Sequence, residues 1–150
     1  MINIDDENPV YIKSKMLLDN TVRDKETLLL IDDEKAILEL CKEFLEQQKY
    51  TVLTAADPDA AIRIAKGYRG QIHMLITDIM MPLMNGLKLA KTLNNIRPDM
   101  KCIYISGCLP ETIFSPEMFK ENIHFIQKPF RLKVFAEKIR NALDSHIPDT

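Results

Sequence analysis

Short apolar runs that alternate with stretches of helical periodicity restrict what this chain can fold into. Five such runs, each bounded by turn residues, lie at 27–31, 51–55, 72–77, 101–105 and 123–126. A run of this kind is typical of a strand that is buried on both faces. Because strand and helix alternate with short connections, we expect an α/β fold in which a five-stranded parallel sheet carries helices on both faces.

Helical spacing of apolar side chains separates these runs. In 35–48, apolar residues recur three, four and seven positions apart, as on a helix with one buried face. The pair Asp57-Pro58 is typical of a helix N-cap and first turn, and we expect that helix to be closed by Gly67. The same spacing predicts two further helices, at 85–95 and 131–143.

The segment 109–122 is less regular than the rest of the chain. Pro116 prevents one continuous helix here, because proline lacks the backbone N–H and clashes with the preceding turn. Ser115 and the proline after it are instead typical of a new N-cap and first turn. We therefore expect a loop or a single turn at 110–114 and a short helix near 116–121.

The ends of the chain are more polar than its centre. Residues 1–26 start with an acidic stretch where a signal peptide would be basic, and they contain a mildly apolar patch at 10–18. We interpret them as an N-terminal extension or a linker, in which the patch forms a turn or two of helix or stays part of the linker. The folded domain is expected at 27–145, followed by a short tail at 146–150.

Composition and charge exclude several classes of function. A net charge of -2 argues against a nucleic-acid groove or an anionic membrane surface as the main partner. No apolar run approaches the roughly 18 residues that a membrane-spanning helix needs. The three cysteines are too scattered for a disulfide framework or a zinc site. We therefore expect a cytoplasmic protein with reduced thiols.

Polar side chains follow four of the five predicted strands. Asp32 and Asp33 come after the first, Asp78 after the third, Ser106 after the fourth and Lys128 after the fifth. The carboxyl ends of parallel strands share one edge, where open α/β folds place their chemistry. Each residue alone could be a helix cap or a turn residue, but that explanation would have to hold for all of them at one edge. The convergence therefore predicts a functional site.

The residue types at this edge favour metal-assisted phosphoryl chemistry. Carboxylates about 4 Å apart repel by about 4 kcal/mol at an effective dielectric near 20, so a compensating Mg²⁺ is expected. An aspartate such as Asp78 is ionised at neutral pH and needs no general base. His73 and His124 lie near the opposite strand ends, and we expect both to be structural. Phosphoryl transfer needs mainly positioning and charge stabilisation, which carboxylates, a metal, Lys128 and a hydroxyl can supply.

The residues at this edge, with their order and spacing, also match a known family. The chain from about Thr27 to Leu143 resembles the receiver domain of two-component response regulators. The resemblance implies a flavodoxin-like, doubly wound five-stranded parallel sheet with strand order 2-1-3-4-5. The matching stretches are 29–34 (LLIDDE), 77–82 (TDIMMP) with Asn85-Gly86, Ser106-Gly107, and 125–130 (FIQKPF).

The resemblance implies a phosphoacceptor and a metal site. Asp78 would accept a phosphoryl group from a histidine kinase or a histidine phosphotransfer domain. Asp33, Asp78 and the backbone carbonyl of Met80 would bind Mg²⁺ directly, and Asp32 would act through a metal-bound water.

The resemblance also implies a conformational switch. Lys128 would pair with the phosphoryl oxygens, and Ser106 would move to hydrogen-bond the same group. Phe125 would follow Ser106 as an aromatic switch, so that a local charge biases a bistable element. Pro116 departs from the family, since it is expected to shorten or displace a helix that often belongs to the output face.

These expectations describe a signalling domain whose only chemistry is its own phosphotransfer and autodephosphorylation. Its partners would be the phosphoryl donor and a downstream protein, with no direct contact to nucleic acid or membrane. The protein would be a monomer or a weak dimer. It would be either a single-domain regulator or a receiver from a larger protein such as a hybrid sensor kinase.

Three alternatives compete with this interpretation. A degenerate receiver that acts only as an interaction module would not need the full acidic set and Lys128. A phosphatase with an aspartate nucleophile would need a second aspartate two residues after Asp78, where this chain has Met80. A flavodoxin-like cofactor binder would need a Ser/Thr/Gly-rich phosphate loop at 32–34, where the sequence is acidic.

Overall fold

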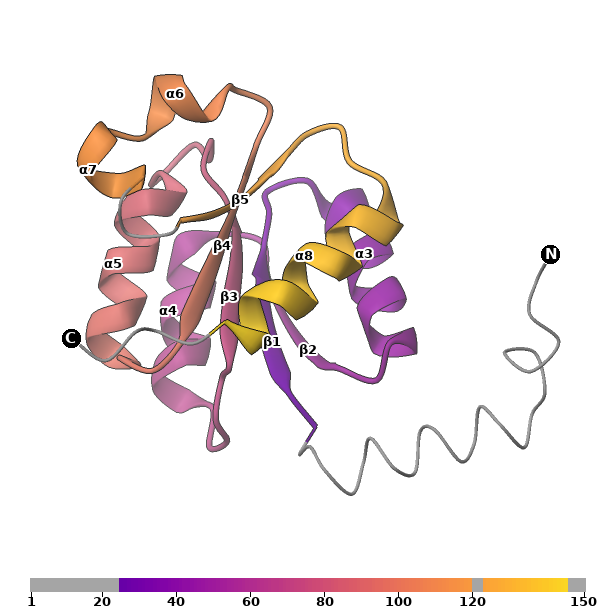
Figure 1. The fold of residues 1–150 in the computed structure, drawn as a ribbon. Helices are drawn as coiled ribbons and strands as arrows, with labels where there is room; N and C mark the ends of the chain where they lie inside the picture. The colour runs from indigo at the N-terminus through magenta and orange to yellow at the C-terminus, as the bar shows by residue number, and fades with distance from the viewer. Residues whose placement is uncertain (1–24, 120–122, 146–150) are drawn as a thin grey trace, which may run out of the picture.

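The computed structural model describes residues 25–119 and 123–145, and its centre is one parallel sheet. The strand order β2-β1-β3-β4-β5 confirms the predicted fold, and every neighbouring pair is parallel. Figure 1 shows the strands in the middle of the molecule with helices on either side. The strands are β1 (Thr27–Ile31), β2 (Thr51–Ala55), β3 (Met74–Asp78), β4 (Lys101–Ser106) and β5 (His124–Gln127).

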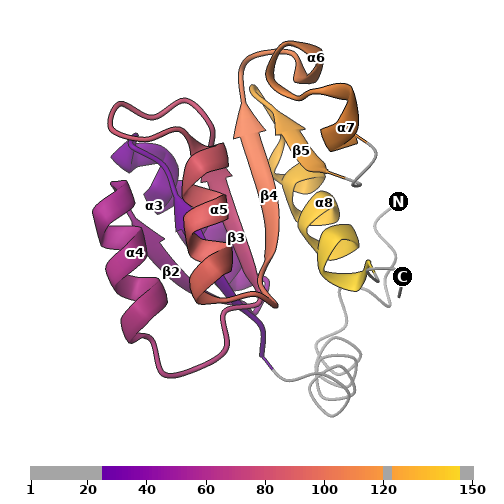
Figure 2. The same cartoon turned by 90° about the vertical axis from the view of Figure 1, so that its left-hand side faces the viewer.

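Two pairs of long helices cover the two faces of the sheet. Helices α3 and α8 pack on one face, and α4 and α5 on the other, as Figures 1 and 2 show. No helix in the described residues has the length and hydropathy of a membrane span. The helices are α3 (Lys35–Gln47), α4 (Pro58–Gly67), α5 (Gly86–Ile96), α6 (Pro110–Ile113), α7 (Pro116–Phe119) and α8 (Leu132–Asp144).

The central strands are apolar throughout because both of their faces are buried. In β1, Leu28 and Leu30 point into the core under α3 and α8, whereas Leu29 and Ile31 point into the core under α4 and α5. All five residues of β3 are buried as well. Burial on both faces explains why these strands lack the alternation of a half-exposed strand. It also fixes the end of β3, and with it the place of Asp78.

Side-chain caps define the starts of α4, where the cap was predicted, and of α5, where it was not. The Ala60 amide donates to Asp57 Oδ1 at 2.8 Å, and the Lys88 amide donates to Asn85 Oδ1 at 2.8 Å. Gly67 does not close its helix in the predicted way, because it is the last residue of α4 and no described glycine has a positive φ. Among the described residues, the left-handed backbone conformation occurs at Lys49, with φ 76°, shortly after α3.

Other boundaries move by one or two residues. β3 begins at Met74 and ends at Asp78, whereas the prediction was 72–77. Ile72 is only 2% exposed, so it belongs to the core without belonging to the strand. The predicted extension and tail lie almost entirely outside the described residues.

The segment between β4 and β5 is broken before Pro116 as predicted, and the single turn expected at 110–114 is the short helix α6. α6 and α7 replace a single helix, and the Met118 amide donates to Ser115 Oγ at 3.4 Å. Phe114, between the two helices, is 4% exposed. Its ring lies 5.6 Å from Tyr104 and 5.7 Å from Phe125, so it anchors this connection to β4 and β5.

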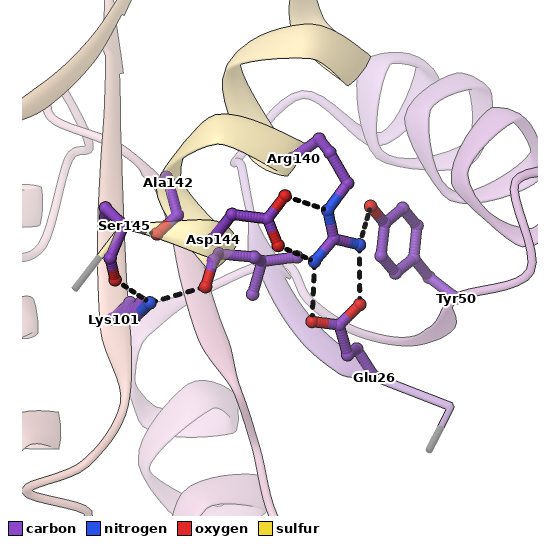
Figure 3. Close-up of polar contacts among 8 residues, drawn as sticks. Glu26, Tyr50, Lys101, Arg140, Ala142, Asp144 and Ser145 are labelled. Carbon is purple, nitrogen blue, oxygen red and sulfur yellow. Dashed lines mark hydrogen bonds and ion pairs between the residues drawn. The ribbon is translucent and has the colours of Figure 1, made fainter. Parts of the chain in front are cut away.

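A polar network ties the end of α8 to the amino-terminal ends of β1 and β2 (Figure 3). Arg140 forms a bidentate pair with Glu26, at 2.7 and 3.0 Å, and it also donates to both carboxylate oxygens of Asp144 and to the Tyr50 hydroxyl. The ammonium of Lys101 donates to the carbonyls of the last turn of α8. These contacts complement the negative end of the helix dipole. They lie at the end of the sheet opposite Asp78.

Arg140→Gln is expected to lower the melting temperature. The substitution removes the cation from two carboxylates, and hydrogen bonds between charged groups contribute about 1.5–3 kcal/mol each. A net loss of about 1–3 kcal/mol corresponds to a fall of roughly 3–12 °C in a domain of this size. Differential scanning fluorimetry measures it, with Lys42→Gln as the control. Lys42 makes only an exposed pair with Glu46 at 3.9 Å, so its loss should shift the melting temperature little.

Candidate functional site

The structure brings the predicted polar residues together at the carboxyl edge of the sheet. Asp32 follows β1, Asp78 ends β3 and Ser106 ends β4. These three residues are 3%, 5% and 0% exposed, while Asp33 is exposed. Lys128 follows β5 and is partly buried. The site therefore combines two buried acids and a buried hydroxyl with one exposed acid and one partly buried lysine.

Lys128 contacts two of the carboxylates. Its Nζ lies 3.0 Å from Asp78 Oδ2 and 3.4 Å from Asp32 Oδ2. Burial alone would lower the pKa of Lys128, but the hydrogen bond to Asp78 and the charge of Asp32 outweigh burial, so its pKa is raised. The side chain is thus a permanent cation at neutral pH.

Backbone amides orient the two buried acids. The Glu34 amide donates to Asp32 Oδ1 at 2.8 Å, and the Met80 amide donates to Asp78 Oδ1 at 3.1 Å. The N-cap position of α3 is Glu34, which makes no side-chain cap. Asp32 therefore orders the loop before the helix and does not cap the helix itself.

Burial disfavours the ionised form of Asp32. Burial raises its pKa above the ordinary aspartate value, and the Glu34 amide and the Lys128 charge only partly oppose this effect. A raised pKa means that the folded state binds a proton more tightly than the unfolded state. The stability contributed by this group therefore falls as the pH rises through the raised pKa. The ionised form of Asp32 is thus less favourable in the folded protein than in the unfolded chain.

Asp32, Asp33 and Asp78 each offer an oxygen, and these oxygens lie within 4.8 Å of one another. Hard carboxylate oxygens that are few in number suit Mg²⁺, which keeps several of its own waters. The buried negative charge, only partly offset by Lys128, is a second reason why a cation fits this donor set. Nearby, Met80 is 63% exposed, so its side chain points largely into solvent.

Gly86 touches the backbone of Asp78. A Cβ at this position would lie 2.3 Å from the Asp78 carbonyl oxygen and 3.0 Å from Ile79 Cα. The Gly86 amide donates to the Ile79 carbonyl at 2.9 Å, which closes the loop between β3 and α5. The sequence places Gly86 among the residues that match the receiver family, but it does not reveal this close approach.

Ser106 ends β4 and Phe125 lies in β5, and their role as a switch stays a prediction. Ser106 Oγ accepts from the Cys108 amide at 3.1 Å, and the Ser106 carbonyl accepts from the Lys128 amide at 2.8 Å. The Phe125 ring packs edge-on against Phe114, a partner that the sequence did not reveal. The two histidines lie near the other end of the strands, where the Thr27 amide donates to His73 Nδ1 at 2.9 Å.

Comparison with known families assigns this architecture. The model of the response regulator receiver domain matches residues 28–140. The chain belongs to the response regulator receiver domain family. This receiver domain is a signalling domain of two-component systems rather than a classical enzyme, and its acidic pocket with Lys128 is consistent with a phosphoacceptor.

Similar proteins include larger signalling proteins. Sensor kinase CckA of Brucella abortus is 30% identical over 140 residues, which are 93% of this chain and 15% of the kinase. Response regulator SaeR of Staphylococcus aureus is 29% identical over 118 residues, or 77% of this chain and 50% of the regulator. The receiver domain thus spans half or less of the length of these curated relatives.

Solved structures share the fold. The receiver domain of hybrid histidine kinase CckA covers 79% of this chain with a TM-score of 0.66 and 29% identity, and 99% of that structure is matched. A CheY-like receiver domain from Methanospirillum hungatei has a TM-score of 0.69 and 28% identity over 81% of this chain and 95% of its own. The strand order and the helices on both faces agree with these likenesses.

Mg²⁺ is expected to raise the melting temperature of this receiver domain. A cation that binds only the folded state stabilises it by about 1.4 kcal/mol at ten times its dissociation constant. Thermal melts at millimolar Mg²⁺, compared with melts in EDTA, measure the shift. Because the ionised form of Asp32 is disfavoured in the folded, metal-free protein, Asp32→Asn should melt a few degrees higher in EDTA and respond less to Mg²⁺. No shift with Mg²⁺ in the wild-type protein would contradict a metal site.

Proposed function

We propose that this chain is the phosphoacceptor receiver of a two-component phosphorelay. Asp78 takes a phosphoryl group from the imidazole of a histidine kinase or a histidine phosphotransfer domain. The domain then changes conformation and signals to a downstream protein. The observation that carries the proposal is the contact of Lys128 with Asp78 and Asp32, beside a third carboxylate, at the carboxyl edge of the sheet.

The chemistry needs one bond to form and one to break. A carboxylate oxygen of Asp78 attacks phosphorus, the bond from phosphorus to the donor nitrogen breaks, and the electron pair returns to the imidazole. Lys128 already lies against Asp78 and would pair with the phosphoryl oxygens. The amide of Met80 holds the carboxylate in place. Positioning and charge supply most of the catalysis in such transfers.

Mg²⁺ has a defined place in this proposal. Asp33, Asp78 and the backbone carbonyl of Met80 would hold it directly, and Asp32 would act through a bound water. When bound, the metal would neutralise charge on the acids and on the phosphoryl group. Lys128 cannot do this alone, because it faces two acids while Asp33 lies at the opening.

The switch would start at Ser106. Its hydroxyl, now bonded to the Cys108 amide, would turn to the phosphoryl group, and Phe125 would move with it. The connection through α6 and α7 follows Ser106 directly, so it is the first segment that such a movement would reach.

Acetyl phosphate tests the proposal without knowledge of the natural donor. Incubation with Mg²⁺ should add one phosphoryl group per chain, which intact-mass spectrometry detects. EDTA should prevent the addition. An unmodified mass at every donor concentration, in a protein shown to be folded, would contradict the proposed function.

A further inference from the structure

The function proposed for Lys128 requires its ammonium to be held in a defined place. Its ammonium must stay between the carboxylates of Asp32 and Asp78, at 3.4 and 3.0 Å. The side chain has four flexible carbons and no rigid fork, so it does not fix its own direction. Its reach to the two acids therefore depends on where the backbone at residue 128 is held.

Two contacts hold that backbone. On the β5 side, the Lys128 amide donates to the Ser106 carbonyl at 2.8 Å and extends the pairing of β4 with β5. After Lys128, the ring of Phe130 stacks on Phe135, with centroids 5.1 Å apart and planes inclined by 24°. Phe135 is fully buried in α8, so this second contact ties the loop to the core under α3 and α8.

Phe130 lies outside the helix that it packs against. α8 begins at Leu132, and the Phe135 amide donates to the carbonyl of its N-cap residue, Arg131, so Pro129 and Phe130 lie before the helix. The Phe130 ring is partly buried and packs on the same core as Phe135. It is thus the side-chain anchor on the α8 side of the lysine, two residues from it.

We propose that Phe130 is a positioning residue that holds Lys128 in place for phosphoryl transfer to Asp78. The inference rests on the proposed function and adds a residue to its machinery. A displacement of about 1 Å in a catalytic group can cost on the order of 100-fold in rate. Loss of the stacked ring should therefore slow phosphorylation while the acids stay where β1 and β3 place them.

Initial rates of phosphorylation by acetyl phosphate, read by intact mass in Mg²⁺, test the role of the ring. Phe130→Leu should be on the order of tenfold slower than the wild-type protein. Phe130→Tyr, which keeps the ring, should restore most of the rate. Phe44→Leu is the matched control, because Phe44 is also a phenylalanine partly buried against this core but belongs to α3 and not to the loop after β5. It should leave the rate within about twofold, since effects of substitutions at sites that share no partners are usually independent.

A double-mutant cycle separates positioning from a general structural effect. In a Lys128→Gln background the ammonium is absent, so Phe130→Leu should cause little further loss. The shift in melting temperature caused by Mg²⁺ should be the same with and without the ring. Phe130→Met, whose unbranched and flexible side chain can adapt to the space left by the ring, is measured in parallel so that a poorly folded Phe130→Leu protein does not decide the result.

Two results would overturn the inference. One is an unchanged rate in Phe130→Leu and Phe130→Met, and the other is an equal fold loss with and without the lysine. Both leave the proposed function intact, because the wild-type protein is still phosphorylated. Failure of the wild-type protein to accept a phosphoryl group would instead contradict the proposed function itself.

Discussion

Asp78→Asn is expected to reduce the phosphoryl adduct formed with acetyl phosphate and Mg²⁺ to background. The carboxylate is the nucleophile in the proposed reaction, and an amide of the same shape has no anionic oxygen to attack phosphorus. Asparagine can still accept the hydrogen bond from the Met80 amide, so the loop after β3 should keep its form. The measurement is the fraction of modified protein by intact mass.

Two further variants sharpen this result. Asp59→Asn removes an exposed acid from the first turn of α4 and should leave the adduct unchanged. Asp33→Asn should retain the phosphoacceptor but need more Mg²⁺. An adduct of wild-type size in Asp78→Asn would place the phosphoryl group on another residue.

Gly86→Ala is expected to destabilise the domain and disturb the phosphoacceptor together. The new Cβ would lie 2.3 Å from the Asp78 carbonyl oxygen, and that oxygen is backbone and cannot rotate away. Overpacking of this kind costs about 1–3 kcal/mol, and the strand end or the loop must shift to relieve it. Melting temperature and phosphorylation rate should both fall, since the backbone that moves is the one that carries Asp78.

Gly67→Ala is the control for glycine substitution in general. A Cβ there meets nothing within 4 Å, and Gly67 is helical. Its replacement should raise stability by about 0.4–1 kcal/mol, because alanine restricts the unfolded chain. If both variants melted at the wild-type temperature, the result would contradict the claim that the close approach at Gly86 excludes a side chain there.

Much of the fold follows from local patterns. Strands buried on both faces leave uninterrupted apolar runs, and the capping residues Asp57 and Asn85 mark where helices begin. Pro116 breaks the helix between β4 and β5 because it lacks a backbone N–H and its ring clashes with the preceding turn. The convergence at the sheet edge follows from parallel topology alone, so Asp32, Asp78, Ser106 and Lys128 could be grouped before any coordinates. The strand order came from the family resemblance.

Contacts between distant positions could not be read in this way. Glu26 lies at the end of a polar stretch, and its partner Arg140 is 114 positions away. Ile72 fits the apolar pattern of a strand, but it is buried in the core just before β3. The sequence pattern therefore predicts a start of β3 that is two residues too early. The packing of Phe114 against Phe125, like the Gly86 contact, depends on how the connections cross the sheet.

The network around Arg140 also brings together two segments that are far apart in the sequence. Glu26, just before the first strand, and Asp144, at the end of the last helix, share one guanidinium. The start of the first described strand and the end of the last described helix are therefore neighbours in space, and both lie at the end of the sheet opposite Asp78. A short peptide could join them without disturbing the sheet, which makes the domain suited to circular permutation or to insertion within another polypeptide.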